Sequence, residues 1–131
     1  MNKIAQEILD NVRVGAMATV NRDRTPAIAA IHFARMGDKI IWISDKNSQH
    51  SKNAFRTGKM EFAVWDDQVR GVFLKTIVSE VSESDKTEAM KAYQEKLKDF
   101  IPRCENPQLY MASIGEIDEK TTTGNWLHYI A

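Results

Sequence analysis

The stretch IIWISDKNSQHSKNAFRTGKMEFAV, residues 40–64, joins two apolar runs through a short polar segment. Both runs are rich in β-branched and aromatic residues, which favour strands. The polar segment, residues 48–57, has Ala54 and Phe55 as its firm apolar positions, and Gly58 follows it as a residue type that commonly ends helices. The stretch therefore predicts a strand, a short surface helix and a second strand.

The predicted helix begins in a region without acidic residues. Helix starts usually favour Asp and Glu, because carboxylates complement the positive end of the helix dipole. Between residues 46 and 60 there is none, and the predicted start instead carries two hydroxyls and two potential cations: Ser48, Ser51, His50 and Lys52. Such side chains and the free N–H groups of a helix start suit a phosphate dianion. A capped polar helix without a ligand is the rival interpretation.

The composition is that of one folded domain with no overall charge. The chain has 131 residues, 43% of them hydrophobic, which suits a single core. Eighteen basic and eighteen acidic residues cancel, which argues against a nucleic-acid or membrane-surface partner. The single cysteine, Cys104, rules out an internal disulfide and supplies no metal cluster. From the lone cysteine we therefore predict no metal. No run approaches the ~18 apolar residues of a membrane span, and the N-terminus has no apolar signal-peptide core, so we predict a cytoplasmic protein.

The residues outside the central stretch add strands and two more helices. An apolar stripe predicts a helix over residues 3–12, ended by Gly15. A second helix is predicted over residues 85–100, where Asp85 and Glu88 fit a capping box. Alternating or continuous apolar runs predict strands over residues 16–20, 27–34, 39–44, 59–65, 71–83 and 109–118, with a last short strand at the C-terminus.

Six or seven strands with two or three helices predict a small barrel, whose strand order does not follow from these patterns. The strand over residues 71–83 is long enough to bend around such a barrel. Trp42 and Trp65 alternate with apolar neighbours and are expected in its core.

The order of these elements resembles the pyridoxamine 5′-phosphate oxidase-like family of FMN-binding split barrels. The resemblance spans roughly residues 5 to 120 and is most specific in residues 40–64, where the family has a strand ending in a hydroxyl residue, then Ser-x-Lys/His, a short helix and the next strand. GVFLKTIVSEVSESDKTEAMKAYQEKL (71–97) and GEIDEKTTTGNWLHYI (115–130) are similar to later parts of the family's pattern. The resemblance implies a mainly β (α+β) fold, a small antiparallel six- or seven-stranded split barrel with two to three flanking helices, as one domain over residues 1–131.

The same resemblance implies FMN as the cofactor, with its phosphate at the start of the predicted helix. Gln49 and His50 partly replace the family's usual Lys or Arg, which leaves the contact set open. The positions carried over are Ser48 and His50, with Ser51 and Lys52 beside them, for the phosphate; Ala30, Ile31, His32, Ile43 and Ser44 for the ring; and Gly71, Lys75 and Trp126 for the ring or its ribityl chain. Two of these have strong rival roles, since His32 also suits a hydrogen-bonded core or interface position and Trp126 ordinary packing.

No set of catalytic side chains stands out, so catalytic residues stay unassigned and the chemistry would belong to the flavin. The first hypothesis is an FMN-dependent oxidoreductase acting on a small unknown substrate. The alternatives are a non-catalytic flavin carrier or sensor and a haem- or deazaflavin-binding split barrel, although the lack of a His-rich tail counts against haem. The family's arginine-rich C-terminal segment for vitamin B6 phosphates is not found, so that substrate is not assigned. Related proteins complete the flavin site with a second subunit, which implies a homodimer with the site at or near the interface.

Overall fold

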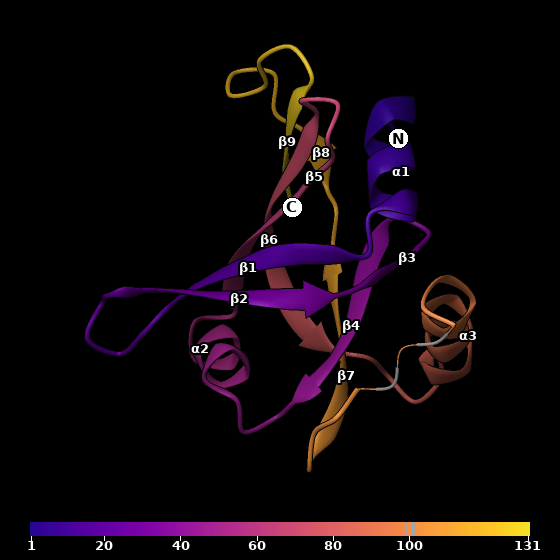
Figure 1. Ribbon diagram of the computed structural model, residues 1–131. Coiled ribbons are helices and arrows are strands. Elements are labelled where there is room, and N and C mark those ends of the chain that lie inside the picture. The colour runs from indigo at the N-terminus through magenta and orange to yellow at the C-terminus, as the bar shows by residue number, and fades with distance from the viewer. Residues whose placement is uncertain (99, 101) are drawn as a thin grey trace.

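The chain folds into a strongly curved β-sheet with helices around it (Figure 1). The computed structural model describes residues 1–98, 100 and 102–131. Seven of its strands have five or more residues, and these are the seven that the sequence predicts. In chain order the elements are α1 (Lys3–Asn11), β1 (Val14–Val20), β2 (Pro26–His32), β3 (Ala34–Met36), β4 (Lys39–Asp45), α2 (Gln49–Thr57), β5 (Lys59–Trp65), β6 (Gly71–Glu80), α3 (Lys86–Lys96), β7 (Pro107–Ser113), β8 (Glu116–Ile117) and β9 (Trp126–Ile130).

The long strand β6 joins the two halves of the sheet. The strand order is β2-β1-β5-β6-β7-β4-β3, and β9 lies beside β6 and carries β8 at its other edge. The first part of β6 pairs with β5, whereas residues 78–80 pair with β7, so the sheet bends along this strand. Every pair is antiparallel except β6 and β9, which run parallel from Gly71↔Trp126 to Lys75↔Ile130. This arrangement confirms the predicted split barrel.

The strand β4 is buried on both faces, which explains its continuous apolar sequence. Ile40 and Trp42 face the main core, which α1 covers at one end. Ile41 faces a second cluster between β3, β4 and α3, to which α3 contributes Tyr93 and Leu97. Figure 1 shows α3 beside β3 and β4, and α2 lying against β1 and β2.

The helix α2 forms where the sequence predicts it, but a polar side chain anchors it. Ser48 is its N-cap and Gly58, with φ 71°, its left-handed C-cap. Phe55 is 46% exposed, whereas Asn53 is fully buried. The Asn53 amide nitrogen Nδ2 donates to Thr19 Oγ1 at 3.2 Å and to Asn21 Oδ1 at 2.9 Å, which ties α2 to β1 and the turn after it.

Two expectations about single residues near the sheet were wrong. The helix α1 ends at Asn11, and Gly15 instead lies inside β1, where the ring of Phe62 occupies the space that a Cβ would need. Trp65 is 54% exposed, because its position at the end of β5 faces outward from the barrel.

The capping box predicted for α3 does not form. Asp85 precedes the helix without a side-chain bond to it, and its carboxylate accepts a hydrogen bond from Ser82 Oγ at 3.0 Å. The helix ends at Lys96, with Leu97 as its C-cap, which is earlier than the predicted residue 100; residue 99 of that span lies outside the described residues.

Two predicted strands are each divided in the structure. Residues 27–34 break at Phe33, whose N–H donates to the Arg13 carbonyl at 3.2 Å, so β2 and β3 lie in different parts of the sheet. Residues 109–118 break between β7 and β8 at Gly115, with φ 76°. A Cβ at Gly115 would collide with the Ile130 carbonyl, which is the reason for glycine at this bend.

Candidate functional site

A cavity of about 270 Å³ lies where β2, β4 and the start of α2 meet the segment that follows α3. We call it the α2 cavity. Its lining is Ala30, Ile31 and His32 from β2, Ile43, Ser44 and Asp45 from β4, Ser48 and His50 at the start of α2, and Phe100, Pro102, Arg103 and Cys104 beyond α3. Seven of the twelve predicted cofactor positions thus come together: Ala30, Ile31, His32, Ile43, Ser44, Ser48 and His50.

His50 is held in the cavity wall by two hydroxyls. Its Nε2 lies 2.9 Å from Ser44 Oγ and 3.2 Å from Ser48 Oγ. Burial lowers the pKa of His50, because the charged imidazolium loses solvation. Near pH 7 the ring is therefore largely neutral and acts as a hydrogen-bonding group, whereas the sequence analysis counts it as a potential cation.

Ser48 organises the start of α2 through its hydroxyl. Ser48 Oγ donates to the Asp45 carbonyl at 2.7 Å and accepts the Ser51 N–H at 3.4 Å. Ser51 is buried behind it, with the two hydroxyl oxygens 2.8 Å apart. The N–H groups of a first helical turn have no intrahelical partner, so the positive end of α2 meets the cavity with donors available for an anion.

An aromatic stack forms another wall of the cavity. The rings of His32 and Phe100 lie with centroids 3.7 Å apart and planes 14° from parallel. Burial lowers the pKa of His32, and the nearby Arg13 lowers it further. His32 is therefore a neutral packing partner of Phe100 as well as a lining residue.

Lys52 lies outside the α2 cavity. It is exposed, one helical turn beyond the N-cap, and its contact with a phosphate stays a prediction. The lining also lacks the three predicted positions on β6 and β9.

Those three positions lie on β6 and β9, at a distance from the cavity along the sheet. The ring of Trp126 covers Gly71, where an added Cβ would lie 2.8 Å from it, and Lys75 Nζ pairs with Glu61 at 3.7 Å. Three strand spacings, roughly 14 Å, separate β2 from β6 along the paired rows of the sheet. One chain therefore does not bring these residues to the α2 cavity.

Sequence reasoning missed the part of the lining that follows α3, including Phe100 and Arg103. These residues lie some fifty positions beyond α2 in the chain. Pairing of β4 with β7 brings them close, since Asp45 pairs with Pro107 and the Lys46 N–H donates to the Asn106 carbonyl at 3.0 Å. No local pattern signals this contact.

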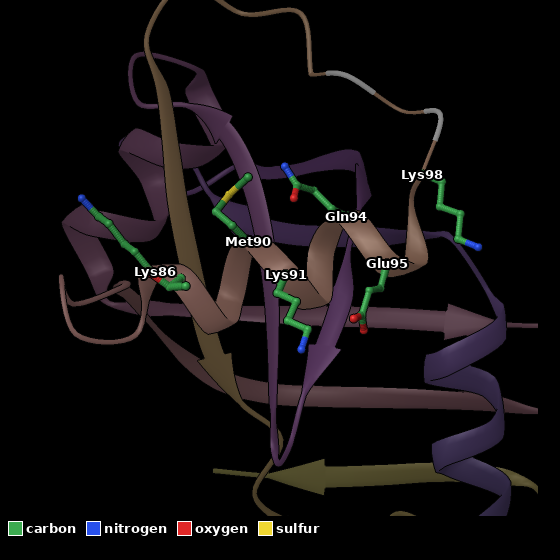
Figure 2. A pocket seen from close by; sticks show the side chains of 7 residues that line it. Lys86, Met90, Lys91, Gln94, Glu95 and Lys98 are labelled. Atoms are coloured by element: carbon green, nitrogen blue, oxygen red, sulfur yellow. The ribbon is translucent and has the colours of Figure 1, made fainter.

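A larger hollow of about 710 Å³ lies along the outer side of α3 (Figure 2). Figure 2 shows the side chains of α3 and its C-terminal extension spread along this side. The described residues around it are Lys86, Thr87, Met90, Lys91, Gln94, Glu95 and Lys98, none of which is a predicted cofactor position. Since one helix supplies the lining, we do not regard it as the functional site.

Two further properties bear on the class of site. Among residues 1–98, 100 and 102–131, no three His, Cys, Asp or Glu side chains gather closely enough to hold a metal ion. In the same part of the chain no helix has the length and apolar character needed to cross a membrane.

The curved sheet, divided along β6 and with a cavity at the start of a short helix, defines a split-barrel protein. The sequence profile described as pyridoxamine 5′-phosphate oxidase matches residues 1–116. The chain therefore belongs to the pyridoxamine 5′-phosphate oxidase family. Among curated proteins, none matches the sequence.

Solved structures of low sequence identity share the fold. An F420 reductase has a TM-score of 0.68 at 15% identity, with 86% of this chain and 94% of that chain covered. A haem-binding protein from Mycobacterium smegmatis has a TM-score of 0.72 at 15% identity, with 86% of this chain and 50% of that chain covered. An FAD-binding protein from Mesorhizobium loti has a TM-score of 0.68 at 14% identity, with 88% of this chain and 91% of that chain covered. The chain spans 53% of another similar protein, of unknown function, from Agrobacterium tumefaciens.

Proposed function

We propose that the chain binds FMN in the α2 cavity and acts as an FMN-dependent oxidoreductase on a small molecule. The observation that carries this proposal is the convergence of seven predicted cofactor positions on one cavity, in a chain of the pyridoxamine 5′-phosphate oxidase family. Flavin-, deazaflavin- and haem-binding proteins of the same fold support a flat redox cofactor in general. The anion-receptive helix start favours a flavin that ends in a phosphate.

The cavity residues suit FMN in their chemistry. Ser48, His50 and the first N–H groups of α2 would hold the phosphate, since hydroxyls and the N–H groups of a helix start donate hydrogen bonds to anions. The edges of β2 and β4, with small Ala30 and apolar Ile43, would hold the ring. When bound, FMN supplies the electron transfer, and the protein supplies position and electrostatics. Ser44 fixes the orientation of His50 through the 2.9 Å contact with its Nε2.

A second copy of the chain would complete the site. The α2 cavity, about 270 Å³, is smaller than the roughly 300–1,000 Å³ of ligand pockets, so FMN would extend beyond it. The outward side of β2, β1, β5, β6 and β9, which we call the open face, carries exposed apolar side chains and a groove of about 700 Å³. We propose that this face packs against the same face of a second chain, giving a homodimer with two equivalent sites.

The first test is the absorption spectrum of the freshly purified protein. We expect flavin bands, and release of the cofactor followed by mass measurement should give FMN. A Soret band or the spectrum of a deazaflavin would contradict FMN while leaving the fold intact. A protein without chromophore that also fails to bind added FMN would contradict cofactor binding altogether.

Catalysis and simple binding are separated by turnover. Under anaerobic conditions, NADH or NADPH should reduce the bound flavin, and an added acceptor should reoxidise it through many cycles. A single reduction without repeated transfer would favour the carrier or sensor interpretation.

A further inference from the structure

The charged groups around the α2 cavity do not by themselves favour an anion. The ionisable residues of the lining are His32, Asp45, His50, Arg103 and Cys104. Burial lowers the pKa of His32 and raises that of the Cys104 thiol, so both are largely neutral near pH 7. Asp45 places a carboxylate three residues before the N-cap of α2, and its Oδ1 accepts a hydrogen bond from the Asn47 N–H at 2.9 Å. Because His50 is largely neutral near pH 7, a cavity without Arg103 would carry a net negative charge.

Arg103 cancels that negative charge. In formal charge the guanidinium balances the one Asp45 carboxylate of the lining, and the positive end of α2 then leaves the cavity receptive to an anion. Within the described residues, Arg103 makes no ion pair, so its donors are available to a ligand. Both Arg103 and Lys52, the other candidate cation, are exposed, but Lys52 does not line the cavity.

We propose that Arg103, from the segment after α3, supplies the fixed positive charge that binds the cofactor's phosphate and selects a phosphorylated flavin over riboflavin. Arg103 thus takes the role of the Lys or Arg that the family's pattern has where this chain has Gln49 and His50. The planar guanidinium can donate two parallel hydrogen bonds to phosphate oxygens, a geometry that an ammonium cannot match. This inference rests on the proposed binding of FMN in the α2 cavity.

The test compares FMN with riboflavin, which lacks the phosphate, by titration of flavin fluorescence. Arg103→Gln removes the charge but keeps most of the side chain, Arg103→Lys keeps the charge, and Lys46→Ala removes an exposed charge from the segment before α2 as a matched control. We expect Arg103→Gln to weaken FMN about ten-fold or more and to change riboflavin by less than about two-fold. Arg103→Lys should recover part of the loss, and Lys46→Ala should bind both flavins as the unaltered chain does.

The outcomes separate this inference from the proposed function. If the unaltered chain prefers FMN and Arg103→Gln still binds it equally well, Arg103 is not the phosphate cation, although FMN binding stands. Equal losses of FMN and riboflavin in Arg103→Gln would overturn the assignment as well, since they would indicate a disturbed cavity. An unaltered chain that binds neither flavin would overturn the proposed function, and this inference with it.

Discussion

His50 lines the cavity at the start of α2, and whether its ring is charged depends on pH. Burial lowers its pKa from the ordinary value of 6.5, while two serine hydroxyls hold its Nε2. In the unfolded chain the imidazole takes up a proton at a higher pH than in the folded one. Between the two pKa values the unfolded state therefore binds more protons, and the folded state loses stability as pH falls.

We predict that the protein without cofactor becomes less stable as pH falls below about 6.5, and that His50→Gln reduces this dependence. His32, whose pKa is also lowered, contributes in the same direction and remains in the variant, so part of the slope should persist. Urea midpoints at about pH 7.5 and about pH 5.5 measure the effect. An identical slope in both proteins would show that His50 titrates as it does in the unfolded chain.

The buried Asn53 side chain holds α2 against β1. Its amide donates to Thr19 and Asn21, and its Oδ1 accepts from Gln49 Nε2 at 2.8 Å and from the Arg56 guanidinium at 3.0 Å. A fully buried amide with partners on both sides leaves several polar groups unpaired when it is removed.

We therefore predict that Asn53→Ala lowers the free energy of unfolding by about 1–3 kcal/mol. It should also weaken FMN binding, because the start of α2 would no longer be fixed beside the cavity. Chemical denaturation and flavin titration measure the two effects. Lys52→Ala, an exposed change on the same helix, serves as the stability control. A loss of stability in the control as large as in Asn53→Ala would show that the buried network is not responsible; helix propensity cannot cause either loss, because alanine is the better helix former.

The positions of the helices and strands can be predicted well from local sequence. Which face of each element is buried, and which elements touch, cannot. The strand, helix and strand of residues 40–64 form where apolar runs, Ser48 and Gly58 predict them. Trp42 and Trp65 stand in similar local patterns, yet one is buried and the other exposed. The strand β4 is covered on both faces, whereas Trp65 lies on the outward face of β5, whose other face meets the core. The start of α2 in the candidate site was predictable by motif, but Arg103 was not, since β4–β7 pairing brings it there.

The open face exposes large apolar side chains. Ile28 is 77% exposed and Ile77 is 59% exposed, both on the outward side of the sheet. Glu61 and Lys75 pair with each other near the groove, so the face presents no strong single charge to repel a copy of itself. Gly71 and Trp126 lie on the same side of the sheet, where a second chain could bring them to the α2 cavity of the first.

We predict that two chains assemble through the open face. The unaltered chain should sediment as a dimer, and the double variant Ile28→Asp with Ile77→Asp as a monomer, because two carboxylates in each face would be buried without partners. Since both side chains are exposed in the single chain, the far-UV circular dichroism of the variant should stay the same. Val69→Asp, an exposed change in the turn between β5 and β6, should leave the dimer intact. If the second chain contributes to the flavin site, the monomeric variant should also lose FMN affinity. An unaltered monomer that holds FMN at full occupancy would refute both the interface and the shared site.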